Sequence, residues 1–234
     1  MPKGADMTYT GPGVMPGFEG RVPHARDGAA LQMQLNAFLG AHEEGLIGFR
    51  RDLHMHPELG FAEYRTTGRI VERLAAAGLK PVVLPKGTGV ICDIGPSDGP
   101  TVALRADIDA LPLLDEKPDV PYRSTVEGVC HACGHDVHTT VMLGAGLFLA
   151  GQAEAGLLPG RVRLIFQPAE ETPGGALDVI AAGGLAGVDR IFAVHCDPRV
   201  EVVVSAFGSA RSRPPATRSS SRSPGPAGTP PGRI

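Results

Sequence analysis

Residues 131–138 read HACGHDVH and place one thiol, three imidazoles and one carboxylate within a single short segment. Thiolate and imidazole are the ligands that a borderline-soft divalent ion such as zinc prefers. The spacing of Cys133 and His135 allows both side chains of an irregular loop to face one ion. This segment therefore predicts a metal site, placed just before an apolar stretch that is expected to form a helix.

Three further groups of polar residues each follow a short apolar run. Glu170 and Glu171 follow one run, His195 closes another, and Asp107 and Asp109 follow a third. If the runs are strands, all three groups lie at carboxyl ends of strands. Open α/β sheets bind their ligands at that edge. The agreement of these positions with the metal-ligand segment favours a metal-dependent hydrolase over a simple binding module.

The elements that would position these groups can be located from the hydrophobic pattern. Short apolar runs predict strands over 81–84, 89–94, 101–106, 161–166 and 190–194. Helical periodicity predicts helices over 31–53, 62–77, 136–149 and 175–182. Several runs are apolar on both faces, which is typical of strands buried between helix layers. Strands interleaved with helices predict an α/β sandwich.

Composition limits the classes of function. The chain has 234 residues, 42% of them hydrophobic, and a net charge of −3, which allows one or two domains with a sizeable core. Residues 1–202 carry no basic stripe, so no nucleic-acid partner is expected. No apolar stretch has the length of a membrane helix or a signal-peptide core, so we expect a cytoplasmic enzyme without a membrane partner. The four cysteines are expected to be thiols or ligands.

Five motifs, taken in order, resemble one family of enzymes. They are RRDLHMHPELGFAE (50–63), ALRADIDALP (103–112), HACGHDVH (131–138), LIFQPAEE (164–171) and AVHCDP (193–198). The chain resembles the metallo-amidohydrolases that include N-acyl-amino-acid amidohydrolases, hippurate hydrolases and auxin-conjugate hydrolases, which are relatives of aminoacylase and glutamate carboxypeptidase. The resemblance covers about residues 31–202, and the joint order and spacing of the motifs make it specific.

The resemblance implies a role for each matching residue. It makes Cys133, His135, Glu171 and His195 ligands of a metal and Glu170 the general base that activates water. It also implies that the aspartates of the 103–112 motif support the metal cluster. The expected activity is hydrolysis of the amide bond of N-acyl amino acids or similar small amides.

The resemblance also implies a fold, a cofactor and an assembly. The fold is a zinc-exopeptidase-like catalytic domain, with a mixed, mostly parallel sheet between helices, interrupted by a smaller lid or dimerisation domain. The cofactors are one or two divalent metal ions, zinc or manganese, and the partner is a small-molecule N-acyl amino acid. Full-length relatives are expected to form homo-oligomers.

The two ends of the chain differ from this pattern. We expect residues 1–28 to be disordered, 29–202 to be the N-terminal part of the catalytic domain, and 203–234 to be a disordered tail. The tail contains seven Ser, six Pro and five Arg but no Asp, Glu or Lys, which cannot build a core. In a shifted reading phase it can encode Gly-Gly-His, so we interpret it as the product of a frameshift near codon 203.

This interpretation leaves the lid domain and the family's last histidine ligand without a counterpart. We therefore expect a truncated, weakly active or inactive enzyme, and a non-catalytic metal-binding fragment is the main alternative. A nucleic-acid adaptor would depend only on the five arginines of 203–234. A cysteine-nucleophile hydrolase is also disfavoured, because His135 lies only two residues from Cys133 and no other base is marked.

Overall fold

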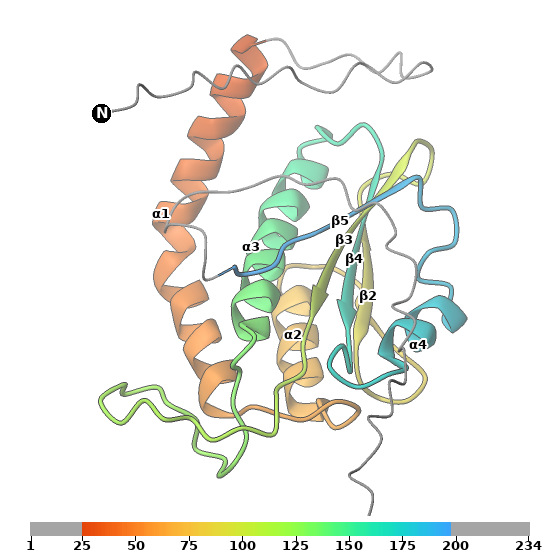
Figure 1. Ribbon diagram of the computed structural model, residues 1–234. Helices are drawn as coiled ribbons and strands as arrows, with labels where there is room; N and C mark the ends of the chain where they lie inside the picture. Colours follow the sequence, from red (N-terminus) through yellow and green to blue (C-terminus); the bar gives the residue numbers. More distant parts are fainter. Residues whose placement is uncertain (1–24, 198–234) are drawn as a thin grey trace, which may run out of the picture. The chain divides into compact units, whose positions relative to one another are not determined.

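The computed structural model of the protein describes residues 25–197 (Figure 1). Its helices are α1 (Ala25–Met55), α2 (Tyr64–Ala76), α3 (His135–Glu154) and α4 (Gly175–Ala181). Its strands are β1 (Val82–Val83), β2 (Val90–Ile94), β3 (Thr101–Asp107), β4 (Arg161–Gln167) and β5 (Arg190–Ala193). The expected disorder of 203–234 and of most of 1–28 lies outside the described residues. Residues 25–28 are helical, so the prediction of disorder was wrong for them.

The strands form one mixed sheet in the order β1-β2-β4-β3-β5. Strand β3 runs parallel to β4 and to β5, whereas β2 runs antiparallel to both β4 and β1. The prediction of a mixed α/β sheet is confirmed. Of its described strand pairings, two are parallel and two are antiparallel. Because β3, β4 and β5 are parallel, their carboxyl ends lie at one edge of the sheet.

Helices cover both faces of the sheet (Figure 1). On one face α2 and α3 pack against the strands and α1 packs against α3, and these elements share a cluster that includes Leu53, Ile70, Leu143 and Phe166, all fully buried. On the other face Val179 of α4 packs with buried residues of β3 and β4. Neighbouring positions of β4 serve opposite faces, as the alternation of side chains in a strand requires.

Close contact between α3 and the sheet depends on a glycine. A Cβ atom at Gly146 would lie 2.5 Å from Cδ1 of Leu164 in β4, so the Leu164 side chain would have to shift to admit a larger residue. This contact places the amino end of α3 beside the carboxyl end of β3, where Asp107 is the last strand residue. The packing of α3 therefore brings the HACGHDVH segment to the edge at which the parallel strands end.

Two features differ from expectation at the level of elements. Helix α1 begins at Ala25, whereas the hydrophobic pattern placed its start near Leu31. Strand β5 is exposed at all four positions, with Phe192 56% exposed, although its apolar sequence suggested burial on both faces. Among residues 25–197, no helix combines the length and apolar character needed to cross a membrane.

Candidate metal centre

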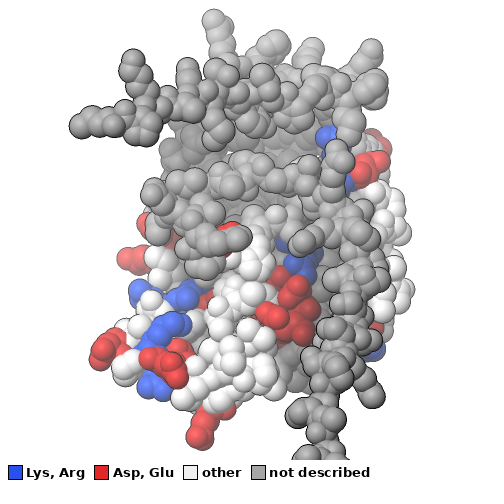
Figure 2. Space-filling view, viewed as in Figure 1, with Lys and Arg blue, Asp and Glu red and all other residues white. Residues whose placement is uncertain are grey.

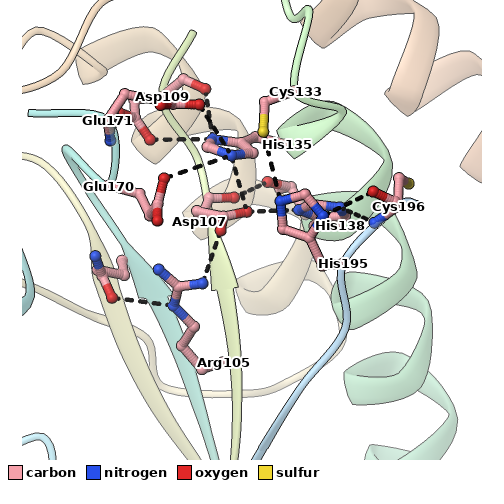
Figure 3. Close-up of polar contacts among 12 residues, drawn as sticks. Arg105, Asp107, Asp109, Cys133, His135, His138, Glu170, Glu171, His195 and Cys196 are labelled. Carbon is pink, nitrogen blue, oxygen red and sulfur yellow. Dashed lines mark hydrogen bonds and ion pairs between the residues drawn. The ribbon is translucent and has the colours of Figure 1, made fainter. Parts of the chain in front are cut away.

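His135 is the centre of a cluster of possible metal donors (Figure 3). It is the first residue of α3 and is 1% exposed. Gly134 precedes it with a φ of 85°, a left-handed conformation that glycine adopts without steric cost. Nδ1 of His135 lies 3.1 Å from Oδ1 and 3.0 Å from the carbonyl oxygen of Asp109. Both partners are acceptors, so Nδ1 carries a proton, and in the neutral ring Nε2 presents a lone pair.

That lone pair has no hydrogen-bond partner within the described part of the chain, although Nε2 is buried. Three carboxylate oxygens surround it at longer range, from Asp107 (3.7 Å), Glu171 (3.8 Å) and Glu170 (3.9 Å). These distances are too long for direct hydrogen bonds. A buried acceptor that faces several anionic oxygens without a donor between them is the arrangement that a cation would satisfy.

Cys133 and His195 form a second side of the cluster. Their Sγ and Nε2 atoms are 3.4 Å apart, and both atoms lie within 4.8 Å of a nitrogen of His135. Nδ1 of His195 donates to the carbonyl oxygen of Cys196 at 2.7 Å, which leaves Nε2 as an acceptor. Burial, followed by the hydrogen bond and charge of Glu171, raises the pKa of Cys133 to about 12. The thiol is thus protonated at neutral pH unless a bound cation displaces its proton.

Asp107 is held by a separate set of contacts. Its Oδ1 accepts a hydrogen bond from Nδ1 of His138 at 2.7 Å, and its Oδ2 accepts one from Arg105 at 2.7 Å. Burial alone would raise the pKa of Asp107, but the His138 bond and the charges of His135 and Arg105 lower it to about 2. Nε2 of His138 accepts the backbone N–H of Cys196 at 2.8 Å, so His138 connects the end of β3 to the segment after β5.

The structure brings together all five residues that the sequence singled out. Cys133 lies in the loop just before α3 and His135 is the first residue of that helix. Glu170 and Glu171 come from the loop after β4, and His195 from the segment after β5. Asp109 accepts a hydrogen bond from His135 and Asp107 accepts one from His138, both histidines of α3. The chemical roles of these residues stay predictions.

Sequence reasoning missed two buried polar groups near the cluster. Asp136 is fully buried and is held by Nδ1 of His54 and by Nε of Arg50, each at 2.8 Å. Glu63 is also fully buried, and its Oε1 accepts the backbone N–H of Ala169 at 2.7 Å. Asp136 lies in the HACGHDVH motif and Glu63 ends the RRDLHMHPELGFAE motif. In each case, a charged residue next to apolar residues was the feature of the sequence that could have identified the group.

The donor set fits a divalent transition-metal ion. Sulfur, imidazole nitrogen and carboxylate oxygen are the ligands of zinc, whose bonds to them are about 2.0–2.3 Å long. Donor atoms that share such an ion are spaced more widely than N–H···O hydrogen-bonded atoms, as Nε2 of His135 and the three carboxylate oxygens at 3.7–3.9 Å are. Nδ1 of His135 donates its N–H to the carboxylate of Asp109, and a metal-bound histidine usually has such a support.

The fold and this cluster define an α/β protein with a cation-binding site at the carboxyl edge of its sheet. The sequence pattern of peptidase family M20/M25/M40 matches residues 103–219, which is half of the chain. The chain therefore belongs to this family, and the resemblance drawn from the motifs is confirmed.

Individual relatives agree with the family assignment. The N-acetyl-L-cysteine deacetylase of Bacillus subtilis is 43% identical over 189 residues, 79% of this chain and 45% of that protein. The crystal structure of the Bacillus subtilis YXEP protein, described as a dinuclear metal binding peptidase, matches with a TM-score of 0.64 and 46% identity. It covers 68% of this chain, and the chain covers 44% of it. This chain thus spans less than half the length of both proteins.

A third relative has a name of a different kind. A protein of Rhodococcus jostii named as a glutamate–cysteine ligase is 56% identical over 161 residues, 68% of this chain. The match takes in only 20% of that much longer protein. Its name therefore carries no argument about the activity of the matched segment.

Proposed function

We propose that this chain binds one or two divalent metal ions, zinc or manganese, and hydrolyses the amide bond of N-acyl amino acids or similar small amides. The observation that carries the proposal is the buried Nε2 of His135, which has no hydrogen-bond partner among the described residues and is surrounded by sulfur, nitrogen and oxygen donors. The names of the Bacillus subtilis relatives, a deacetylase and a dinuclear metal binding peptidase, support it.

In this proposal Cys133, His135, Glu171 and His195 hold the metal. Their donor atoms come from three segments that meet only in the folded chain, and the set of soft and hard donors suits zinc or manganese. Asp109 orients His135 through Nδ1. The centre needs Cys133 as a free thiol, and all four cysteines are free, which fits an enzyme of the reducing cytoplasm.

Hydrolysis of an amide requires a nucleophile, stabilisation of the carbonyl oxygen and a proton for the leaving nitrogen. When bound, a divalent ion polarises the carbonyl and lowers the pKa of water. Glu170 is part-exposed, with Oε2 3.9 Å from Nε2 of His135, so a water molecule and an amide can reach its carboxylate. Glu170 removes the proton from the attacking water and delivers it to the nitrogen as the C–N bond breaks.

Metal binding without turnover is the second candidate function. The chain spans 45% of the deacetylase and 44% of the YXEP protein, so more than half of each relative lies outside the match. Hydrolysis therefore has to be tested separately from metal uptake.

Cobalt(II) substitution of the full chain tests the proposal, because thiolate ligation of cobalt gives a charge-transfer absorbance band. We expect the wild type to show this band, Cys133→Ser to lose it and Cys196→Ser to keep it. Cys196 is the matched control, since it lies beside the cluster but is not assigned as a ligand. Cleavage of N-acetyl-L-cysteine by the zinc or manganese form would support the enzyme. Metal uptake without cleavage of any acyl-amino acid would favour the second candidate, and absence of metal uptake would contradict both.

A further inference from the structure

We propose that Glu63 is a positioning residue for the Glu170–Glu171 pair. Its buried carboxylate accepts the backbone N–H of Ala169 and thereby holds the loop that presents both glutamates to the cluster. The inference rests on the proposed function in one respect only, because it treats this pair as the working carboxylates of the site.

The contact between Glu63 and Ala169 joins two distant parts of the sequence. Glu63 directly precedes α2 and is 0% exposed, and its Oε1 lies 2.7 Å from the backbone nitrogen of Ala169, 106 residues further along the chain. A carboxylate buried without a cationic partner loses its hydration and keeps its place only through strong hydrogen bonds. Among the described contacts, this backbone N–H is the donor that the loop after β4 supplies to it.

Ala169 has a backbone conformation that needs such support. Its φ is +48°, in the left-handed region that residues with a Cβ rarely adopt. Residues in this region persist where the surroundings hold them, often at functional sites. The next two residues are Glu170 and Glu171, and the backbone nitrogen of Glu171 donates to Oδ2 of Asp109 at 3.0 Å. Two carboxylates therefore fix the backbone just before and within the glutamate pair.

The loop that carries Glu63 is shaped to support the glutamate loop. A Cβ atom at Gly60 would lie 3.1 Å from Cβ of Ala169, so glycine allows the two loops to approach closely. The same loop is joined to the segment of Asp109, because the carbonyl oxygen of Glu58 accepts the backbone N–H of Ala110 at 2.8 Å. The PELGFAE part of the first motif thus contacts both segments that bear carboxylates of the site.

The carboxylate at this position interacts with the backbone N–H groups of Glu63, Ala169 and Phe61. Burial raises the pKa of Glu63 above its usual range, so keeping the group ionised is costly, and its Oε2 has no hydrogen-bond partner among the described residues. A well-packed apolar side chain is commonly at least as stable at a buried site. The retained carboxylate is explained if its function is to hold the backbone of Phe61 and of Ala169 together, and Ala169 leads directly into the glutamate pair.

The test compares Glu63→Ala, Glu63→Gln and the double variant Glu63→Ala/Ala169→Gly, in the full chain. Three quantities are measured: hydrogen exchange of the Ala169 amide, the cobalt(II) dissociation constant, and kcat and KM for an acyl-amino acid. In Glu63→Ala we expect exchange to quicken about tenfold, cobalt affinity to fall about 10–100-fold, and kcat to fall more than KM rises. Glutamine keeps an acceptor oxygen and should preserve most of each property. The added glycine should restore part of the cobalt affinity, because glycine adopts the left-handed turn unaided.

Leu74→Ala is the control for loss of stability, since Leu74 is fully buried in α2 away from the cluster. It should lower the unfolding midpoint yet leave the Ala169 amide and the cobalt affinity as in the wild type. If Glu63→Ala does not fold, Glu63→Asp replaces it, because it keeps the charge but is one methylene too short to reach Ala169.

The proposal would be overturned if Glu63→Ala kept the wild-type exchange rate of the Ala169 amide and the wild-type cobalt affinity. It would also be overturned if Leu74→Ala changed both quantities as much as Glu63→Ala does. If the wild type hydrolyses no acyl-amino acid, the enzymatic part of the proposed function fails. Exchange and cobalt binding still decide the role of Glu63 in that case.

Discussion

At the scale of single residues, His135 has the largest number of possible donor partners. Its ring nitrogens lie within 4.8 Å of donors in three groups, namely Cys133 with His195, Asp107 with His138, and Glu170 with Glu171. The two adjacent glutamates approach the same Nε2 but differ in exposure, with side chains 39% and 27% exposed respectively. The more exposed Glu170 is better placed to exchange protons with water and substrate, and Glu171 to bind metal.

Substitution of the two glutamates should separate these roles. In Glu170→Gln we expect kcat to fall about 10²–10⁴-fold, because the base is lost, while metal content stays that of the wild type. Glu171→Gln, the matched neighbour, should lose metal as well as turnover. Metal content is measured by atomic emission on dialysed protein and kcat with an acyl-amino acid. Full turnover in Glu170→Gln would remove Glu170 from the role of base.

The sequence predicted those residues whose chemistry is visible in short motifs. Cys133 and His135 are spaced for one ion, and adjacent glutamates after an apolar run are a recognisable pair. The contacts of Glu63 and His138 could not be predicted in this way. Glu63 pairs with a backbone amide 106 residues away, and His138 pairs with the amide of Cys196. Such contacts depend on how strands and loops are juxtaposed, which no local pattern records.

At the scale of elements, apolar runs located every described strand to within a few residues, because β-branched and aliphatic side chains favour the strand conformation. The order of strands was not predictable. Strand β4 lies between β2 and β3, although about 55 residues separate β3 from β4 in sequence. The early start of α1 was hidden because Gly28 and the glycine-rich sequence before it favoured a break.

The connection between α1 and α2 gives a prediction about pH. Asp52 of α1 accepts hydrogen bonds from Arg65 at 2.7 Å and Arg69 at 3.2 Å, both in α2. Partial burial alone would raise the pKa of Asp52, but the hydrogen bond and charge of Arg65 and then those of Arg69 lower it. A lowered folded-state pKa means that this stabilisation is present above the unfolded pKa of about 4 and is lost as pH falls through the folded value.

We expect Asp52→Asn to reduce the free energy of unfolding at pH 7 by about 0.5–1 kcal/mol, because the ion pairs are part-exposed. The difference from the wild type should shrink as the pH is lowered below about 4 and also in concentrated salt. Urea unfolding at neutral and acidic pH measures both effects. Asp98→Asn, in the exposed loop after β2, is the control. If the free energy of unfolding of Asp52→Asn depended on pH in the same way as that of the wild type, the pH effect could not be assigned to Asp52.

At the scale of the whole molecule, the site is assembled from one edge of the sheet. On the face shown in Figure 2, basic and acidic side chains of the described residues are interspersed, without an extended basic area. The arginines on which a nucleic-acid adaptor would depend lie in residues 203–234, outside the described residues. The cluster instead depends on the ends of β3, β4 and β5 and the start of α3 being held together. A metal ion bound there would cross-link segments that are distant in sequence.

This cross-link predicts that metal stabilises the fold as a whole. A ligand that binds the folded chain alone adds about 2.7 kcal/mol to the free energy of unfolding at a free concentration of 100 times its Kd. Zinc should therefore raise the unfolding midpoint of the full chain, and a chelator should reverse the change. The midpoint is followed by circular dichroism at fixed pH.

Two controls test whether the stabilising ion is bound at the proposed site. Magnesium should give little shift, because it prefers oxygen ligands and gains little from Cys133 or His195. Glu170→Gln should keep the zinc response, whereas Cys133→Ser should lose most of it, since only the second removes a proposed ligand. If zinc raised the midpoint equally in both variants, the stabilising ion would be bound elsewhere. The convergence of donors on His135 would then have no bearing on metal binding.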